Sequence, residues 1–217
     1  MAAKLEIQSL TKRYQVGKPV INNFSFTAES GDLVALEGPN GSGKTTLLRL
    51  LSTAAFPTSG SVNFNSLSIH DQPQKYLEHA GIVIDDPELP EGLTAVELLE
   101  WIVRQRKQWT DENSTEAIAK LLDTLRLDER RNQLIKTYSS GMLKKVQIAS
   151  ALITMPSILI IDEPFRGLDD ATIEALEKEL KVRKEDGTII FLASHRHDIL
   201  AEMANQNIGC PDDILEA

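Results

Sequence analysis

The segment Gly38-Pro39-Asn40-Gly41-Ser42-Gly43-Lys44-Thr45 constrains this 217-residue chain more than any other feature. It fits the spacing G-x-x-x-x-G-K-[ST] at every defined position. An apolar run, 32–37, precedes the motif, and a stretch with one apolar face, 45–51, follows it. We therefore expect a buried strand, a sharp turn and a helix in that order.

The residue types in this turn suit a bound triphosphate. Glycines let the backbone curl so that its N–H groups point into one anion-sized hollow, and the helix that follows adds its positive N-terminal end. Lys44 would supply a full charge to the β- and γ-phosphates, Thr45 a hydroxyl to Mg²⁺, and Thr46 a hydrogen bond to the α-phosphate. The alternative, a glycine-rich turn without a ligand, is disfavoured by the flanking strand and helix. The predicted nucleotide-binding residues are Gly38, Pro39, Asn40, Gly41, Ser42, Gly43, Lys44, Thr45 and Thr46.

A second chemical motif ends the apolar run 158–161 with the carboxylates of Asp162 and Glu163. Ligands of parallel sheets sit at the carboxyl ends of the strands, so both residues are placed for chemistry. Because successive side chains of an extended chain point in different directions, we expect them to differ in role. Asp162 is predicted to face the Mg²⁺ shell, and Glu163 to act as general base toward the attacking water. Strands often end in acidic residues, so the motif gains its meaning from the glycine-rich turn.

Composition limits the class of protein. The formal net charge is −9, which disfavours general binding to nucleic acid. The single cysteine, Cys210, excludes an internal disulfide and a cysteine-rich metal site. The longest apolar run is far shorter than the roughly 20 residues that a membrane span needs. We therefore expect a chain that does not cross a membrane by itself.

The pattern along the chain predicts an α/β fold with a mostly parallel central sheet and an N-terminal antiparallel β region. Short strands are expected at 4–7 and 23–27, and nearly all-apolar strands at 158–161 and 188–192. A helix is expected over 171–183, with Asp170 as its N-cap.

The middle of the chain has a helical texture. Thr94 and Glu97 match a capping box, and apolar residues then recur at helical spacing in two stretches. We interpret about residues 92–137 as a helical insertion. With the helix that follows it, this makes a helical subdomain over about 92–155 within a single domain, 1–217.

Taken with these motifs, residues 138–142, Tyr-Ser-Ser-Gly-Met, give the chain a resemblance to the ATP-binding subunits of ABC transporters. The segment is similar to that family's signature, Leu-Ser-Gly-Gly-Gln, and retains its serine and second glycine as Ser139 and Gly141. The resemblance implies that this segment faces the γ-phosphate held by another subunit. The simpler alternative is that Ser139 is an ordinary helix N-cap.

Further positions extend the resemblance over nearly the whole chain. Residues 164–169 resemble the family's D-loop, which implies that Asp169 lies at a dimer interface. Phe165 and Arg166 replace the usual small polar residues, and Arg166 either makes its own contact across that interface or is simply solvated. His195 resembles the switch histidine that contacts the γ-phosphate and positions water and base.

Two positions carry open alternatives. Tyr14 matches the aromatic residue that stacks on adenine, although packing in the core is the alternative. Asp85 falls where the family has a glutamine that links Mg²⁺ and water to the membrane partner, unless the alignment is shifted to Ile84 or Asp86. An aspartate can ligate Mg²⁺ but, when ionised, cannot donate a hydrogen bond. We therefore predict lower basal hydrolysis than in a glutamine-bearing relative.

The resemblance implies an ATP- and Mg²⁺-dependent ATPase that pairs with a second copy, or a related subunit, around two ATP molecules. An integral membrane partner of exporter type would be energised from the cytoplasmic face of the cell membrane. Two alternatives stay open: a soluble ATPase of the same superfamily, and a nucleotide-dependent interaction module with little turnover. We also expect the closing strands after His195 to be reduced or missing, with no regulatory domain appended.

Overall fold

The parallel sheet at the centre of the molecule positions every chemical motif. The structure is a computed structural model that describes residues 2–14, 17–84, 88–110 and 113–215. The sheet has the order β6-β7-β8-β3-β9, and all of its neighbouring strands run parallel. Its strands are β6 (Ala80–Val83), β7 (Ile158–Asp162), β8 (Ile189–Ala193), β3 (Leu33–Glu37) and β9 (Gln206–Gly209).

Both faces of this sheet are buried, which explains why its strands read as apolar runs. In β7, Ile158 and Ile160 contribute to one hydrophobic cluster, while Leu159 and Ile161 contribute to another on the opposite face. The alternation has the period of two that an extended strand imposes. The two clusters fix the sheet between layers and hold the ends of its strands in place.

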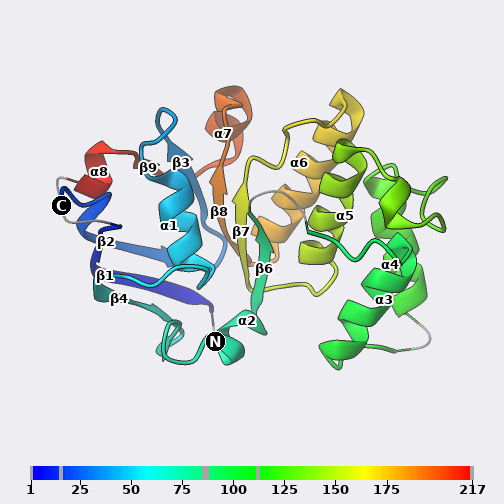
Figure 1. Ribbon diagram of the computed structural model, residues 1–217, viewed down its shortest axis with the longest axis horizontal. Helices are drawn as coiled ribbons and strands as arrows, with labels where there is room; N and C mark the ends of the chain where they lie inside the picture. The colour runs from blue at the N-terminus through cyan, green and yellow to red at the C-terminus, as the bar shows by residue number, and fades with distance from the viewer. Residues whose placement is uncertain (1, 15–16, 85–87, 111–112, 216–217) are drawn as a thin grey trace.

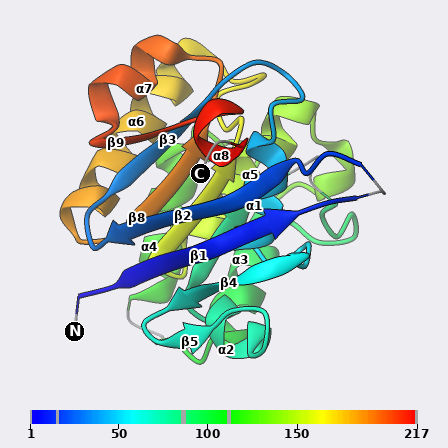
Figure 2. The ribbon, with the colours of Figure 1, turned by 90° about the vertical axis from the view of Figure 1, so that its left-hand side faces the viewer.

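The N-terminal β region forms a second, antiparallel sheet with the order β2-β1-β4-β5 (Figure 2). Helix α1 (Lys44–Leu51) shares one hydrophobic cluster with both sheets, and Figure 1 shows it beside them. A short helix, α2 (Pro73–Leu77), precedes β6. The strands are β1 (Lys4–Lys12), β2 (Ile21–Glu29), β4 (Ser59–Phe64) and β5 (Leu67–Ser68).

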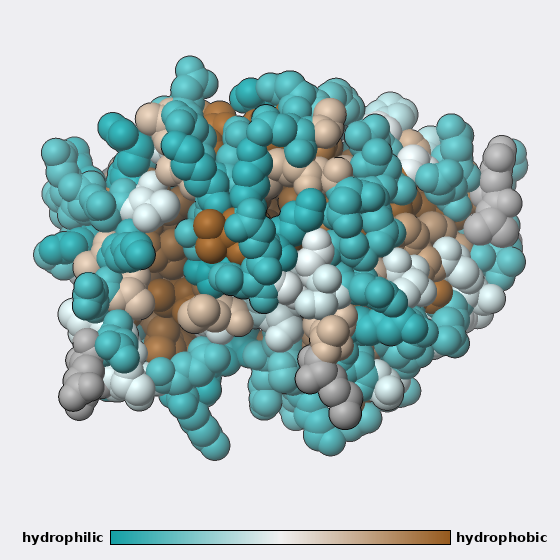
Figure 3. Space-filling model, turned by 180° about the vertical axis from the view of Figure 1, so that it is seen from behind, coloured by the Kyte–Doolittle hydropathy of each residue, from teal (hydrophilic) through white to brown (hydrophobic). Residues whose placement is uncertain are grey.

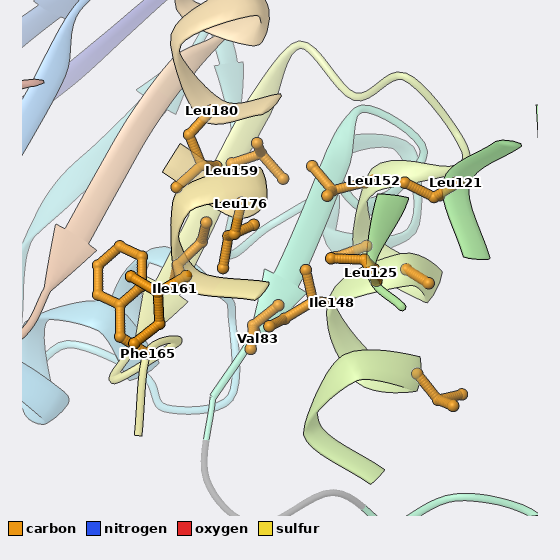
Figure 4. Close-up of a cluster of buried hydrophobic side chains, with 14 of the residues drawn as sticks. Val83, Leu121, Leu125, Ile148, Leu152, Leu159, Ile161, Phe165, Leu176 and Leu180 are labelled. Carbon is orange, nitrogen blue, oxygen red and sulfur yellow. The ribbon is translucent and has the colours of Figure 1, made fainter. Parts of the chain in front are cut away.

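Helices pack on the far side of the parallel sheet. The Thr94 side chain accepts a hydrogen bond from the Glu97 backbone N–H, and the Glu97 carboxylate accepts from the Thr94 N–H, so the predicted capping box is confirmed. Figure 4 shows Ile148 and Leu152 packed among apolar side chains from β6, β7 and neighbouring helices. These helical elements are α3 (Ala95–Gln105), α4 (Ser114–Thr124), the 3-10 turn η1 (Ile135–Thr137), α5 (Ser140–Leu152), α6 (Asp170–Glu185) and α7 (His197–Met203).

The predicted α/β fold with a parallel and an antiparallel sheet is confirmed, and two local expectations need correction. Helix α6 is capped by Asp169, whose carboxylate accepts from the Thr172 N–H, so the prediction of Asp170 as N-cap was wrong by one residue. Strand β9 and the short helix α8 (Asp212–Leu215) were not predicted, and β9 adds a further strand to the parallel sheet. The grouping of about residues 92–155 as one subdomain stays a prediction.

The face of the molecule that is turned away from the viewer in Figure 1 is mostly hydrophilic (Figure 3). Seen from behind, apolar side chains gather in a band on the half of the molecule that carries the helices α3 to α6 (left in Figure 3). Within the described residues, none of the helices combines the length and the apolar character needed to span a membrane.

Candidate nucleotide-binding site

The site is built where three neighbouring strands end. Strands β7, β8 and β3 are adjacent and parallel, so the residues after their carboxyl ends meet at one edge of the sheet. Asp162 ends β7 and Glu163 follows it, His195 follows β8, and the glycine-rich loop follows β3. A cavity of about 1250 Å³ lies here, and its lining includes Asn40 to Thr46, Ser140, Gly141, Lys144, Asp162, Glu163, Arg166 and His195.

The glycine-rich loop needs its glycines for conformation and for space. Gly38, Gly41 and Gly43 have φ angles of 146°, 79° and 104°, which side-chain-bearing residues rarely adopt. A Cβ added to Gly38 would lie 1.9 Å from the carbonyl oxygen of Cys210. The loop therefore curls tightly and delivers the chain directly into α1.

The loop already holds a positive charge and an unpaired polar atom. The Lys44 side chain is buried, and its ammonium donates to the carbonyl oxygens of Gly38 at 2.6 Å and Pro39 at 3.0 Å. The hydroxyl oxygen of Ser42 is buried and has no hydrogen-bond partner among the described residues. Unpaired buried polar atoms are costly, so this cradle fits an anion such as a phosphate group.

A pair of oxygen donors lies at the start of α1. The Thr45 hydroxyl donates to Oδ2 of Asp162 at 2.7 Å, which links the glycine-rich loop to β7. Among the described residues, no group of three or more histidine, cysteine or acidic side chains is placed to hold a metal by itself. One hydroxyl and one carboxylate fit Mg²⁺, which typically takes few protein ligands and completes its shell with phosphate oxygens and water.

Glu163 leaves the strand in a strained conformation, with φ of 47°. Its backbone N–H donates to the carbonyl of Ala193, and its Oε2 accepts from the His195 N–H at 3.3 Å. The other oxygen, Oε1, is buried without a hydrogen-bond partner among the described residues and lies 3.6 Å from His195 Nε2. Glu163 lines the cavity, and a carboxylate oxygen without a hydrogen-bond partner can accept a proton from water.

The same imidazole also reaches the glycine-rich loop. His195 Nε2 lies 3.1 Å from Oδ1 of Asn40. The sequence predicted both residues for the site but not their contact, because 155 positions separate them along the chain. The histidine therefore stands between the loop and Glu163.

The segment that resembles a signature motif faces this cavity through Ser140 and Gly141. The Ser139 side chain accepts from the Met142 N–H at 3.3 Å and caps α5, so the N-cap interpretation is confirmed. A Cβ added to Gly141 would lie 2.6 Å from the Gly167 carbonyl oxygen, so a glycine is needed for this close approach. The positive end of α5 thus points toward the same cavity.

Comparisons with known proteins identify the family of the chain. A family model described as ABC transporter matches residues 21–166. The chain belongs to the ABC transporter family.

Individual relatives extend the match over most of the chain. The uncharacterized ABC transporter ATP-binding protein YhcH of Bacillus subtilis is 33% identical over 94% of the chain and 64% of its own length. The bacitracin transport ATP-binding protein BcrA of Enterococcus faecalis is 31% identical over 88% of the chain and 61% of its own length. The chain thus spans about three-fifths of these curated relatives. A dimeric structure of the ATP-binding cassette MJ0796, in a post-hydrolysis state bound to ADP and Pi, superposes with a TM-score of 0.85 at 25% identity and covers 98% of this chain and 97% of that one.

Asp169 and Arg166, from the segment that resembles the D-loop, have different surroundings. Asp169 forms an ion pair with Lys145 at 3.0 Å and accepts from the Thr172 hydroxyl at 2.8 Å. These hydrogen bonds, first from Thr172 and then from Lys145, hold the pKa of the Asp169 carboxyl well below its usual range. Arg166 lines the cavity and its side chain is exposed, so both interpretations from the sequence, a contact across a dimer interface and a solvated arginine, stay open.

The remaining ABC positions lie outside the cavity or outside the described residues. The Tyr14 side chain is 57% exposed, with Lys12 Nζ 4.8 Å from the ring centroid, so the core-packing alternative for Tyr14 was wrong. An exposed ring remains available as a stacking platform. Asp85, the predicted metal ligand, lies outside the described residues.

Proposed function

We propose that this chain is an ATP-binding and ATP-hydrolysing subunit that energises an ABC transporter. The observation that carries the proposal is the meeting of Lys44, the Thr45–Asp162 pair and Glu163 in one cavity. An anion cradle, a pair of Mg²⁺ ligands and a carboxylate base are the parts that phosphoryl transfer to water needs.

Each group of the chain has a physical task in this proposal. The Lys44 ammonium exchanges its two loop carbonyls for the β- and γ-phosphates, and the Ser42 hydroxyl and the loop N–H groups bind further phosphate oxygens. Thr45 and Asp162 hold Mg²⁺, which supplies charge neutralisation at the phosphates when bound. Tyr14 provides a flat surface for adenine.

Glu163 and His195 act on the water molecule. The free Oε1 of Glu163 accepts its proton, and the hydrogen bond from the His195 N–H to Oε2 keeps the carboxylate oriented. The His195 ring is placed to donate to the γ-phosphate once its contact with Asn40 is exchanged. Catalysis then rests on positioning and electrostatic stabilisation.

We further propose that the site is completed by a second copy of the chain or a related subunit. The second subunit would present its Ser139, Gly141 and Asp169 to the γ-phosphate side of the cavity. The dimeric, nucleotide-bound MJ0796 cassette supports this arrangement by similarity. In this proposal about residues 92–155 form the unit that carries the signature segment toward the partner.

The membrane partner is proposed from the family. The similarity to BcrA, a bacitracin transport protein, supports an exporter-type partner, and such a partner would hold the chain on the cytoplasmic face of the cell membrane. Asp85 is proposed to lie at the coupling position and to assist in Mg²⁺ binding. The acidic net charge of −9 supports a partner other than nucleic acid.

Phosphate release from Mg-ATP by the purified chain tests the proposal. We expect steady hydrolysis by the parent and a loss of about 100- to 10,000-fold in Glu163→Gln, as for removal of a general base. Equal, negligible rates in both proteins would favour a nucleotide-dependent interaction module instead.

Capture of the chain from solubilised membranes tests the transporter role. It should bring down an integral membrane protein; recovery of ribosomes or nucleic acid would contradict the transporter role.

A further inference from the structure

The segment Gln206–Leu215 packs against the glycine-rich loop. Strand β9 lies beside β3, the strand that leads into that loop (Figure 1). The two strands pair in parallel, with Glu37 opposite Gly209. At the end of this pairing the Cys210 N–H donates to the carbonyl oxygen of Glu37 at 2.6 Å. The carboxyl ends of β3 and β9 therefore lie side by side where the glycine-rich loop begins.

Two glycines of the loop are in direct contact with this segment. A Cβ added to Gly38 would lie 1.9 Å from the carbonyl oxygen of Cys210, so the two backbones touch. A Cβ added to Gly43 would lie 2.6 Å from Cδ1 of Ile214. Gly43 is the N-cap of α1, immediately before Lys44, so Ile214 packs where the loop leads into the helix.

The segment is folded back by its own hydrogen bonds. The Asp213 carboxylate accepts from the Gly209 N–H at 2.5 Å, and the Leu215 N–H donates to the carbonyl of Pro211 at 3.0 Å. Helix α8 packs on β2, and the Ile214 side chain is fully buried in the cluster shared with α1. Burial of this aliphatic side chain, on a helix of only four residues, stabilises the folded-back position of the segment.

We propose that the segment Gln206–Leu215 is a positioning element for nucleotide binding, with Ile214 as its principal contact. Docking of this segment holds Gly38 and Gly43 in the curled conformation that aims the loop N–H groups at phosphate. By linkage, a nucleotide that binds the curled loop must stabilise the docked segment by the same factor. The inference rests on the nucleotide binding proposed above and adds that docking of this segment sets the nucleotide affinity.

Cys210 offers a readout of docking. It is the single cysteine of the chain and is 4% exposed, and burial raises the pKa of its thiol to about 11. A thiol reagent can attack it at an appreciable rate only when the segment leaves the loop. The rate of Cys210 modification therefore measures undocking in the intact chain.

The test compares Ile214→Ala with Ile118→Ala, a matched loss of a buried isoleucine in α4, remote from the loop. Fluorescent-nucleotide binding and Cys210 modification are measured with and without Mg-ADP, at a temperature where all proteins are folded. Ile214→Val, which removes Cδ1 alone, is the milder variant should Ile214→Ala fail to fold.

We expect Mg-ADP to slow Cys210 modification in the parent. Ile214→Ala should weaken nucleotide affinity about tenfold and speed modification, within the usual range of coupling. Ile118→Ala should leave both unchanged, and Ile214→Val should be intermediate. In hydrolysis Ile214→Ala should raise KM with kcat retained, because Ile214 touches no reacting group.

Two results would overturn the inference: unchanged nucleotide affinity in both Ile214 variants, or Cys210 modification that is insensitive to nucleotide in the parent. Failure of the proposed function looks different, because then the parent itself binds no nucleotide.

Discussion

The imidazole Nε2 of His195 lies 3.1 Å from Oδ1 of Asn40 and so links the end of β8 to the glycine-rich loop. The same nitrogen lies 3.6 Å from Oε1 of Glu163. A single ring thus stands between the loop that would hold phosphate and the carboxylate that would accept a proton. Any movement of the loop on nucleotide binding changes the surroundings of the proposed base.

Removal of this ring should impair hydrolysis more than binding. In His195→Ala the carboxylate keeps the backbone N–H but loses the imidazole beside Oε1, so we expect phosphate release to fall by about 100-fold. Affinity for ADP, which has no γ-phosphate for the ring to contact, should change little. His197→Ala, an exposed neighbour at the start of α7, is the control, and equal rates for both variants would contradict the role of His195.

Removal of the Thr45 hydroxyl should weaken the response to Mg²⁺. Thr45→Val keeps the shape of the side chain but removes the donor to Asp162. We expect the Mg²⁺ concentration for half-maximal hydrolysis to rise about tenfold, as for loss of one interaction worth roughly 1.4 kcal/mol. Thr124→Val, which removes an exposed hydroxyl bonded within α4, should leave the Mg²⁺ titration unchanged; a similar shift in both would defeat the assignment.

Asp169 should contribute stability that depends on pH. Its pKa is depressed in the folded chain, so its charge stabilises the fold above the unfolded pKa, near 3.8, and this contribution is lost as the pH falls below that value. Asp169→Asn retains a capping side chain but loses the ion pair with Lys145, whereas Asp169→Ala loses both.

Urea unfolding checks this prediction. Asp169→Ala should be less stable than the parent by about 1 kcal/mol at pH 7, with Asp169→Asn between them. The deficit of Asp169→Asn should stay constant from pH 8 to 5 and shrink below about pH 4, where the Asp169 carboxyl of the unfolded parent is protonated while that of the folded parent is still ionised. A stability difference between the parent and Asp169→Asn that grows as the pH falls would contradict the stabilising role of the Asp169 carboxylate.

A methyl group at Gly141 should separate two segments of the site. The added Cβ of Gly141→Ala meets the Gly167 carbonyl oxygen at 2.6 Å, which forces the start of α5 away from the loop after Glu163. We expect a stability loss of about 1–3 kcal/mol by thermal unfolding and weaker ATP-dependent self-association. Gly92→Ala, where the methyl group meets nothing within 4 Å, is the control and should behave like the parent.

Features of the site that arise from neighbouring residues could be predicted from the sequence, whereas contacts between residues far apart in the chain could not. The glycine-rich loop carries its own spacing and flanking elements, so its geometry follows from local sequence. The helix cap was placed at Asp170 instead of Asp169 because two adjacent aspartates suit an N-cap equally well from sequence. In the folded chain Asp169 is favoured as the N-cap, because Lys145 of α5 forms an ion pair with its carboxylate.

Tertiary pairing also explains what was missed. Strand β9 reads Gln-Asn-Ile-Gly, with Ile208 as its one large apolar residue, and it forms only by pairing with β3. No local pattern distinguishes such a segment from a loop. The close approach of Ile214 to Gly43 could not be predicted from the sequence for the same reason, because it depends on the tertiary fold.

The central claim is that the cavity is half of an ATP site completed by a second subunit. Light scattering of Glu163→Gln, with and without saturating Mg-ATP, tests it most directly, because the variant should bind ATP without consuming it. We predict a mass of 24.1 kDa without nucleotide and twice that mass with Mg-ATP. A mass that stays at 24.1 kDa while ATP is demonstrably bound would contradict the claim.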